Sequence, residues 1–358
     1  MTSTLVLYSS DIENYCQHPL QTGKKIVDTV SALKNSHLPI DLYESDRIAE
    51  IEDIHAVHHP AYVDYIKRIS ESGGGFIGLD EESVIDKNTF NAALKSAGIS
   101  LYSVEAILND KYDSAFTLTM PAGHHAGRTY GGGLCIFNNL AIAAQKARKV
   151  GNLKRILAID WDAHFGNGVY DIFHGDPNFY AISMHEYPIE EYPIDVEDGT
   201  LLDKGFTAFS LPALVKDDDY FMIFKELLNV VSERFNPELI MVSAGQDGHF
   251  ADCWGTLSLT AGLYKKLAEL VRNTANKYTE GKFVLYLEGG YGPAFTLSNL
   301  AIVSGITGKD INIDDSEFEG IETEDRKKYV ALSQYYHGTE NLKDKLKCIL
   351  DKIGDTFV

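Results

Sequence analysis

The sequence predicts an α/β fold, in which one domain is built around a central, mostly parallel sheet flanked by helices. Short apolar runs recur along the chain, and each run ends in polar residues. Such runs are typical of strands that are buried on both faces of a parallel sheet. Between the runs lie segments whose apolar residues repeat at helical spacing. The alternation of these two patterns indicates a doubly wound domain.

The elements can be assigned in chain order. The predicted strands are residues 115–120, 155–159, 179–184, 239–243 and 283–287. The predicted helices are residues 139–150, 218–235 and 260–278. Residues 1–98 have a looser and more helical pattern, the acidic residues 310–325 are expected to form a surface loop, and residues 341–353 a closing helix.

Length and composition favour one domain. The 358 residues are 44% hydrophobic, which excludes wholesale disorder. The chain contains no linker rich in proline, glycine or serine that would divide it into domains. We expect a single domain over residues 1–358, with its characteristic motifs between residues 121 and 305. None of these features predicts an oligomeric state.

The charge and the cysteines restrict the partners and the compartment. A formal net charge of -20 argues against direct binding to nucleic acid, whose phosphates would repel the chain. A solvated acidic surface explains this charge without any ligand, although lysine-rich tails or polyamines would also fit. The four cysteines form no C-x-x-C pair, and no apolar run approaches the roughly 20 residues that span a bilayer. We therefore expect a cytoplasmic protein without membrane contact.

Polar clusters follow the ends of all the predicted strands. In chain order they are His124 and His125, residues 160–164, His185, residues 246–249 and residues 288–291. Ligands of open α/β sheets bind beyond the carboxyl ends of the strands. The placement of these clusters therefore predicts one functional site at that edge of the sheet.

Two of the clusters carry groups suited to metal-assisted proton transfer. His124 and His125 are adjacent, and burying two imidazoles is costly unless each ring nitrogen has a partner. Asp162 and His164 stand two residues apart after an apolar strand. One oxygen and one nitrogen ligand on the same side of the chain suit Zn²⁺ or a similar divalent ion.

The chain resembles the superfamily of histone deacetylases and acetylpolyamine amidohydrolases. The sequences PAGHHA (121–126), GLCIFNN (133–139), DWDAHFGNG (160–168), SAGQD (243–247) and LEGGY (287–291) occur in the family order. The resemblance extends from His18 to Gly305 and implies an arginase/deacetylase-like α/β domain, which agrees with the periodicity. It also implies hydrolysis of the amide of an acetylated lysine side chain or an acetylated polyamine.

By this resemblance, Asp162, His164 and Asp247 would hold one catalytic zinc ion per chain. Three protein ligands leave a position for water and for the substrate carbonyl. Bound zinc lowers the pKa of water toward about 7 and polarises the amide oxygen. The resemblance does not distinguish zinc from iron or cobalt.

The resemblance also implies which groups move protons. His125 would act as general base and then as general acid, while His124 would give electrostatic support. Asp160 would orient His124, and Asn167 would contact His125. An amide at that position is typical of the class II-like and bacterial branches of the family. Tyr291 would donate a hydrogen bond to the oxyanion that forms during hydrolysis.

The family also binds potassium near its active site. By position, the ligands would be Asp160, Asp162, His164, Ser183 and the backbone carbonyl of Met184. A second potassium site would use backbone groups of Phe173, Asp176 and Phe179, which the sequence does not test.

Departures from the family pattern concentrate at the substrate tunnel. Leu134 follows Gly133 where the family has an aromatic residue, and Tyr192 would form the opposite wall. Trp254 lies at the rim, where stacking on a cationic substrate and ordinary packing are equally good interpretations. Asp80 would match the rim aspartate that binds the backbone of a peptide substrate. We expect these residues to contact the substrate.

Several conspicuous side chains are not assigned to the chemistry. His249 follows Asp247 at a metal-ligand spacing, but the family often has a histidine there that does not contact the metal. Cys135 has no base partner in the sequence and is interpreted as a small buried residue. The family's arginine below the metal has no counterpart, and Lys24 or Lys25 occupies its region.

Three functions are compatible with these observations. The first is a zinc-dependent deacetylase that acts on acetyl-lysine in proteins or peptides, and the second is a deacetylase of acetylpolyamines or other small acyl amides. The third, a non-catalytic module that binds acyl-lysine, is disfavoured because no proposed ligand, imidazole or phenol is missing. A di-manganese ureohydrolase is also disfavoured, since Asp247 and His249 lack the second carboxylate that a two-metal site needs.

Overall fold

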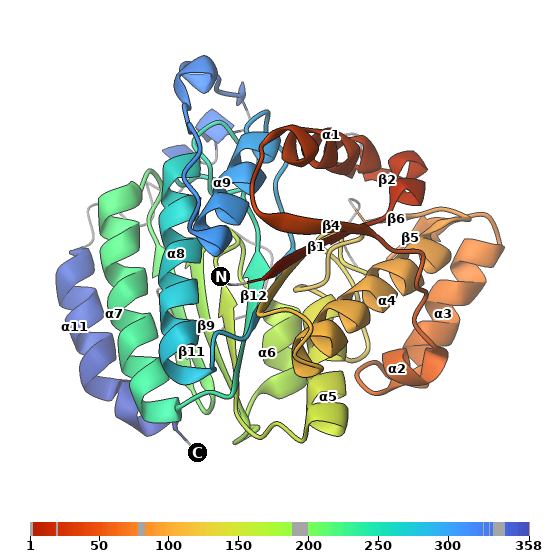
Figure 1. Cartoon of the computed structure of the whole chain (residues 1–358), viewed down its shortest axis with the longest axis horizontal. Helices are drawn as coiled ribbons and strands as arrows, with labels where there is room; N and C mark the ends of the chain where they lie inside the picture. Colours follow the sequence, from red (N-terminus) through yellow and green to blue (C-terminus); the bar gives the residue numbers. More distant parts are fainter. Residues whose placement is uncertain are drawn as a thin grey trace.

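The computed structural model of the chain describes residues 3–18, 21–77, 83–187, 200–324, 326–328, 330–331 and 341–357. The largest sheet has helices on both of its faces (Figure 1). The α/β fold that the sequence predicts is therefore confirmed.

Nine strands form this central sheet, in the order β10-β11-β9-β8-β12-β13-β7-β1-β4. They are β1 (Thr4–Tyr8), β4 (Ile40–Glu44), β7 (Ser114–Leu118), β8 (Ile156–Asp160), β9 (Phe179–Glu186), β10 (Leu201–Asp203), β11 (Phe206–Leu211), β12 (Leu239–Ala244) and β13 (Phe283–Leu287). Neighbouring strands are parallel, except that β10 pairs antiparallel with β11. The expectation of a mostly parallel sheet is confirmed.

The sheet has more strands than the sequence predicts. The predicted runs correspond to β7, β8, β9, β12 and β13, whereas the pattern does not predict β1, β4, β10 or β11. The edge strand β4 alternates half-buried and exposed residues, and β11 interrupts its apolar residues with Thr207 and Ser210, so neither has a continuous apolar run. The more helical prediction for residues 1–98 is incomplete, because β1 is a fully buried strand inside the sheet.

Helices cover both faces of the sheet (Figure 1). One face packs against α1 (Gly23–Asn35), α7 (Asp217–Phe235), α8 (Ala261–Tyr278), α9 (Phe295–Thr307) and α11 (Leu342–Lys352). The other face packs against α2 (Ile51–His55), α3 (Pro60–Glu71), α4 (Thr89–Leu108), α5 (Asn139–Gly151) and α6 (Asn167–Phe173). The four predicted helices are confirmed as α5, α7, α8 and α11.

Short elements complete the described chain. They are η1 (Ser10–Asn14), β2 (Cys16–His18), β3 (Gln21–Thr22), β5 (Gly75–Phe76), β6 (Val84–Ile85), η2 (Ser316–Phe318) and η3 (Ile353–Thr356). The acidic residues 310–324 are mostly exposed, as a surface loop should be. Phe318 is an exception, because it is buried.

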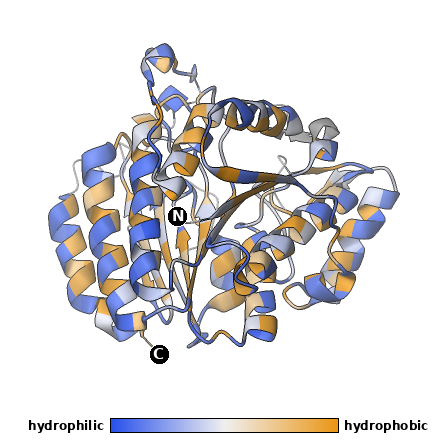
Figure 2. Cartoon of the chain, viewed as in Figure 1, coloured by the Kyte–Doolittle hydropathy of each residue, from blue (hydrophilic) through white to orange (hydrophobic). Residues whose placement is uncertain are grey.

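Two hydrophobic cores, one on each face of the sheet, hold these layers together. Leu227 of α7 and Leu267 of α8 belong to one core, while Leu101 of α4 and Ala143 of α5 belong to the other. In Figure 2, hydrophilic and hydrophobic residues alternate along α7 and α8, as expected of helices that bury one stripe against a sheet. Within the described ranges, none of the helices combines the length and the apolar character that crossing a membrane requires.

The strand ends bring the predicted polar clusters to one edge of the sheet. The neighbouring strands β8, β12 and β13 end at Asp160, Ala244 and Leu287. Because these strands are parallel, the segments that follow them leave the sheet at the same edge. The sequence motifs that lie far apart in the chain therefore meet there.

Helix α4 approaches a neighbouring backbone segment closely at Gly98. A Cβ atom on Gly98 would lie 2.5 Å from the carbonyl oxygen of Arg47 and 2.7 Å from the nitrogen of Ala49. The Ala49 amide also donates to the carbonyl of Leu94 on the same helix, at 2.9 Å. Only glycine permits this crossing without a shift of the backbone.

We predict that Gly98→Ala destabilises the protein. Alanine is favoured over glycine inside a helix by about 1 kcal/mol, but overpacking costs about 1–3 kcal/mol, and the clash here is with backbone. The free energy of unfolding in urea should fall by roughly 1–2 kcal/mol. Gly262→Ala in α8 is the control, because its Cβ would meet only the Thr260 hydroxyl, at 3.3 Å. Equal stability of Gly98→Ala and wild type would contradict the close approach.

Candidate active site

Asp162, His164 and Asp247 converge on one point beyond the carboxyl ends of β8 and β12. Their potential ligand atoms all lie within 4.8 Å of one another. The Nδ1 atom of His164 is 2.8 Å from Asp247 Oδ2 and 3.2 Å from Asp162 Oδ1. Both aspartates are completely buried, while His164 is partly exposed. The three residues that the sequence predicts as metal ligands are thus brought together.

Backbone amides hold the two carboxylates in place. Asp162 Oδ2 accepts a hydrogen bond from the Gly289 amide at 2.8 Å, and Asp247 Oδ1 accepts one from the Ala163 amide at 2.7 Å. A Cβ atom on Gly289 would lie 2.4 Å from Asp247 Oδ2. Glycine at this position therefore lets the chain after β13 approach both carboxylates.

The electrostatics of this cluster favour a bound cation. Burial, together with the nearby Asp162 carboxylate, raises the pKa of Asp247 to about 8. Burial by itself disfavours the imidazolium of His164, but the carboxylates of Asp247 and Asp162 raise the pKa of this ring well above its usual value. Two buried carboxylates need positive charge beside them. A divalent ion would supply it, and two oxygen ligands with one imidazole nitrogen form a suitable donor set.

The adjacent histidines point at different partners. His124 Nδ1 lies 3.0 Å from Asp160 Oδ2, and His125 Nδ1 lies 2.7 Å from Asn167 Oδ1. The centroids of the two imidazole rings are 3.9 Å apart. These are the partners that the sequence predicts for each ring, with Asp160 at the end of β8 and Asn167 at the start of α6.

The two rings differ in protonation. Burial opposes a charge on His124, but Asp162 and Asp160 overcome it and raise the pKa of His124 to about 10. Burial, helped by the positive charges of His124 and His164, lowers the pKa of His125 well below its usual value. The surroundings therefore favour the charged form of His124 and the neutral form of His125.

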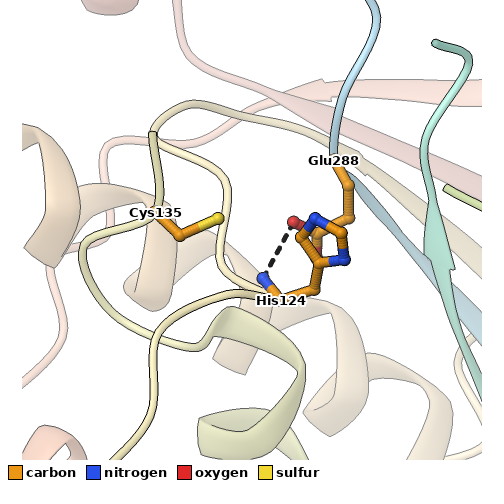
Figure 3. Close-up of side chains that lie close together, drawn as sticks. All are labelled: His124, Cys135 and Glu288. Carbon is orange, nitrogen blue, oxygen red and sulfur yellow. Dashed lines mark hydrogen bonds between the residues drawn. The ribbon is translucent and has the colours of Figure 1, made fainter. Parts of the chain in front are cut away.

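Glu288 is a buried carboxylate that binds the backbone at the histidine pair. It accepts hydrogen bonds from the amides of Gly123 (2.7 Å) and His124 (3.1 Å), and burial raises its pKa to about 7. Figure 3 shows the sulfur of Cys135 directed toward His124 and Glu288 from a neighbouring loop. Cys135 is completely buried, in agreement with its interpretation as a small buried residue.

Tyr291 is held at both ends of its peptide backbone. Its amide and that of Gly292 each donate to Asp252 Oδ2 at 2.7 Å, while the ammonium group of Lys25 donates to its carbonyl oxygen. The Tyr291 ring is buried and lies 4.1 Å from the Trp254 ring, centroid to centroid, at an interplanar angle of 50°. Trp254 thus contacts the tyrosine that the sequence predicts to be catalytic.

The structure describes some of the residues that the sequence predicts to line the substrate tunnel. Gly133 and Leu134 have φ angles of 51° and 62° in a loop beside the histidines, and the Leu134 amide donates to the Ser83 hydroxyl at 2.8 Å. The Leu134 side chain is buried. Asp80 and Tyr192 lie outside the described residues, so their expected roles stay predictions.

The residues predicted to bind potassium fall into two separate places. Ser183 stands opposite Asp160 across the β8-β9 ladder, and Met184 follows it. The Ser183 hydroxyl is buried and has no hydrogen-bond partner in the described part of the chain. Phe173, Asp176 and Phe179 instead precede or begin β9, at the opposite end of that strand; the Asp176 carboxylate pairs with Arg148 at 2.6 Å.

His249 points away from the metal cluster, as expected for a residue that is not a ligand. Its Nε2 atom lies 2.9 Å from Asp315 Oδ1, and its Nδ1 atom accepts a hydrogen bond from the Ala251 amide at 3.1 Å. Both ring nitrogens therefore have protein partners.

The sequence of this chain is similar to those of known proteins. The family model of the histone deacetylase domain matches residues 18–304. A protein of Archaeoglobus fulgidus named "Probable deacetylase" is 35% identical over 316 residues, which cover 84% of this chain and 86% of that protein. The chain belongs to the histone deacetylase family. A "Histone deacetylase-like amidohydrolase" of Pseudomonas aeruginosa is 30% identical over 266 residues, covering 73% of this chain and 69% of that protein.

One further relative and one solved structure are also similar to this chain. Human "Polyamine deacetylase HDAC10" is 33% identical over 261 residues, which are 69% of this chain but only 38% of that protein. The crystal structure of the HDA15 HD domain superposes with a TM-score of 0.77 at 20% identity, covering 97% of this chain and 100% of that one. At this low identity the superposition supports the fold alone.

Some residues around this deacetylase-family site are not predicted by the sequence analysis. Glu288 and Asp252 support the backbones of His124 and Tyr291, and both are buried. Glu288 directly follows β13 inside the LEGGY motif, which was the available signal for it. Asp252 lies eight residues beyond the end of β12. His58 gives no such signal, because its contacts depend on two segments far along the chain.

His58 fixes the loop that carries the histidine pair. Its ring is 1% exposed; Nδ1 lies 2.8 Å from the Gly127 carbonyl oxygen, and Nε2 accepts a hydrogen bond from the Asn138 amide at 2.9 Å. A carbonyl can only accept, so Nδ1 carries the hydrogen and the ring is neutral. Burial lowers the pKa of His58 to about 4.

We predict that His58 makes this deacetylase-family domain sensitive to acid. The unfolded chain binds the His58 proton with a pKa near 6.5, whereas the folded protein does so only near 4. Stability is therefore unaffected above pH 6.5 and falls by about 3 kcal/mol as the pH drops toward 4. Urea unfolding across this range should show a smaller acid loss in His58→Gln.

The neighbouring, exposed His59 provides a matched control for this measurement. His59→Gln retains His58 and should keep the acid loss of the wild type. If His58→Gln lost stability with falling pH as steeply as wild type does, other groups would be responsible for the loss.

Proposed function

We propose that the chain is a zinc-dependent deacetylase that hydrolyses the amide of N-acetyl-lysine in protein or peptide substrates. One observation carries this proposal: the three potential metal ligands lie next to the imidazole of His125, whose surroundings favour its neutral form. The rings of His125 and His164 are 6.2 Å apart, centroid to centroid. The proposed base therefore lies directly beside one of the proposed metal ligands. We expect the protein to act in the cytoplasm.

Asp162, His164 and Asp247 would hold one zinc ion. Their donor atoms are closely spaced, and both carboxylates are buried. Burial and the nearby Asp162 raise the pKa of Asp247 to about 8, so a bound cation would relieve the repulsion between the carboxylates. When bound, zinc supplies Lewis acidity that polarises the substrate carbonyl and makes water more acidic. The protein supplies the remaining groups.

His125 is the proposed general base. Asn167 donates through Nδ2 to the Tyr130 hydroxyl, at 3.3 Å, so its Oδ1 faces His125 Nδ1 as an acceptor. Nδ1 of His125 therefore carries the hydrogen, and Nε2 carries the lone pair that takes a proton from water. The same nitrogen can then give the proton to the leaving amine.

His124 and Tyr291 are proposed to stabilise negative charge. The His124 imidazolium is held by Asp160 and provides a fixed positive charge beside His125. Burial raises the pKa of Tyr291 well above its usual value, so its hydroxyl stays protonated and can donate to the developing oxyanion. A donor of this kind strengthens as the carbonyl oxygen gains charge.

An acetylpolyamine or another small acyl amide is the second candidate substrate. The contact of Trp254 with Tyr291 favours it, because an indole at the rim of the site can attract a cationic amine. The similarity to a protein named a polyamine deacetylase also supports it. A non-catalytic role is the least favoured, because the predicted ligands, both imidazoles and the phenol are all present. Direct binding to nucleic acid is not proposed.

We also propose a potassium ion beside the catalytic cluster. The buried hydroxyl of Ser183, without a partner among the described residues, lies opposite Asp160 in the strand register. Together with Asp162, His164 and the Met184 carbonyl, these groups would supply mainly oxygen ligands, which suit a monovalent cation.

The substitutions Tyr291→Phe and His125→Ala should each nearly abolish turnover. Loss of an oxyanion donor costs roughly 10²- to 10³-fold in rate, and loss of a general base roughly 10²- to 10⁴-fold. Turnover should be measured with acetyl-lysine peptides, free acetyl-lysine, acetylspermidine and acetylputrescine. The peptide should be the best substrate of the wild type; preference for acetylspermidine would favour the second candidate.

Tyr65→Phe on the exposed surface of α3 is the control for Tyr291→Phe, because it removes a hydroxyl without touching the site. It should retain wild-type turnover. Wild-type rates in folded Tyr291→Phe and His125→Ala would refute the mechanism.

Metal analysis should find one transition-metal ion per chain. Asp162→Ala removes one of the three ligands, so it should abolish both the bound ion and turnover. Asp218→Ala, an exposed aspartate in the first turn of α7, should keep both. Two metal ions per chain would point instead to a two-metal hydrolase.

A further inference from the structure

The chain after α9 returns to the loop at residues 247–257, which lies at the edge of the site. Asp315 binds His249 at 2.9 Å, and Phe318 packs in a small apolar cluster with Ala251. Further along, Arg326 is only 3% exposed. These contacts bring a segment with no catalytic residue against the loop that carries Asp252 and Trp254.

Arg326 binds two backbone carbonyls of this loop. One terminal nitrogen donates to the carbonyl oxygen of Gly255, and the other donates to that of Leu257 at 2.6 Å. A planar guanidinium that spans two acceptors fixes their relative position better than a flexible ammonium would. The acceptors are themselves in buried residues, so removing the guanidinium would leave their carbonyls without these donors.

A carboxylate holds the same short segment. Glu186, at the end of β9, accepts hydrogen bonds from the Thr256 amide at 2.5 Å and from its hydroxyl at 2.8 Å. The Glu186 amide in turn donates to the carbonyl of Ala163 at 2.7 Å. Residues 255–257 are therefore held by both a buried guanidinium and a carboxylate, and the backbone of Glu186 is bonded to the metal-ligand loop.

The segment fixed in this way supports the catalytic groups directly. Gly255 packs so closely on Asp247 that a Cβ atom would lie 2.0 Å from the Asp247 carbonyl oxygen. Asp252 binds the amide of Tyr291 at 2.7 Å and that of Trp254 at 2.9 Å. A displacement of residues 255–257 would therefore be transmitted to both aromatic rings at the rim of the site.

We propose that Arg326 is a positioning residue that holds the loop at residues 252–257 and thereby sets the placement of Tyr291 and Trp254. Its hydrogen bonds go to backbone carbonyls of this loop, and its charge also interacts with the carboxylates of Glu186 and Asp252. The kinetic part of this inference rests on the proposed deacetylase function, whereas the placement of Trp254 does not.

Arg326→Met is the first test. It should lower kcat by roughly 10- to 100-fold, since displacements of about 1 Å at a reacting group have effects of this size. KM should change much less, because the Tyr291 hydroxyl acts mainly on the transition state. Arg326→Lys keeps the charge and one donor group, and it should recover part of kcat. Rates are compared on protein that is folded and loaded with metal.

Tryptophan fluorescence tests the same proposal without activity. The chain has two tryptophans; Trp161 is completely buried, so access to a neutral quencher reports mainly on Trp254. Acrylamide should quench Arg326→Met more strongly than wild type, with Arg326→Lys between them. Unchanged quenching in folded Arg326→Met would overturn the proposal, whether or not the protein proves to be a deacetylase.

A double substitution separates positioning from a general loss of structure. If Arg326 acts through the Tyr291 hydroxyl, Arg326→Met should cause little further loss of kcat in a Tyr291→Phe background. A full 10-fold or greater additional loss would overturn the proposed route. Lys327→Met is the matched control, because this exposed neighbour pairs only with Glu324 among the described residues. It should change neither kcat nor quenching, and an effect equal to that of Arg326→Met would also overturn the proposal.

Discussion

The crowding of two buried carboxylates around one imidazole is the constraint on which the site depends. Asp162 and Asp247 face His164 at hydrogen-bond distance beyond the ends of β8 and β12. Negative charge at this density is unstable in a protein interior unless cations and oriented amides surround it. The amides of Ala163 and Gly289 supply part of that field, and a metal ion would supply the rest.

The properties of the neighbouring groups follow from this charge. The carboxylates raise the pKa of His124, and positive charge on that ring helps to lower the pKa of His125, whose ring centroid is 3.9 Å away. The two adjacent histidines thus differ in their proposed roles. His124, beside Asp160, provides a charge, and His125, beside Asn167, provides a base. Burial of the pair makes this distinction sharp, because charges interact more strongly when water is excluded.

The rim of the site depends on contacts between distant segments. Tyr291 is positioned by Asp252 and Lys25, which precede it by 39 and 266 residues. Asp252 lies in a loop that is hydrogen-bonded by both Glu186 and Arg326. Precise placement of a phenol next to a metal requires such support, because a catalytic group that is only about 1 Å out of place loses much of its effect.

The sequence by itself determined the α/β class, five strands, four helices and the composition of the metal and histidine clusters. It could do so because buried parallel strands are continuous apolar runs, and because functional groups follow the strand ends. It missed β4, β10 and β11, whose short or interrupted apolar patterns give no clear signal, and it also missed β1, although residues 5–8 are a continuous apolar run. Only the tertiary structure decided the protonation of the two histidines and the roles of His58, Glu186 and Arg326, because burial and backbone contacts across the chain have no local sequence pattern.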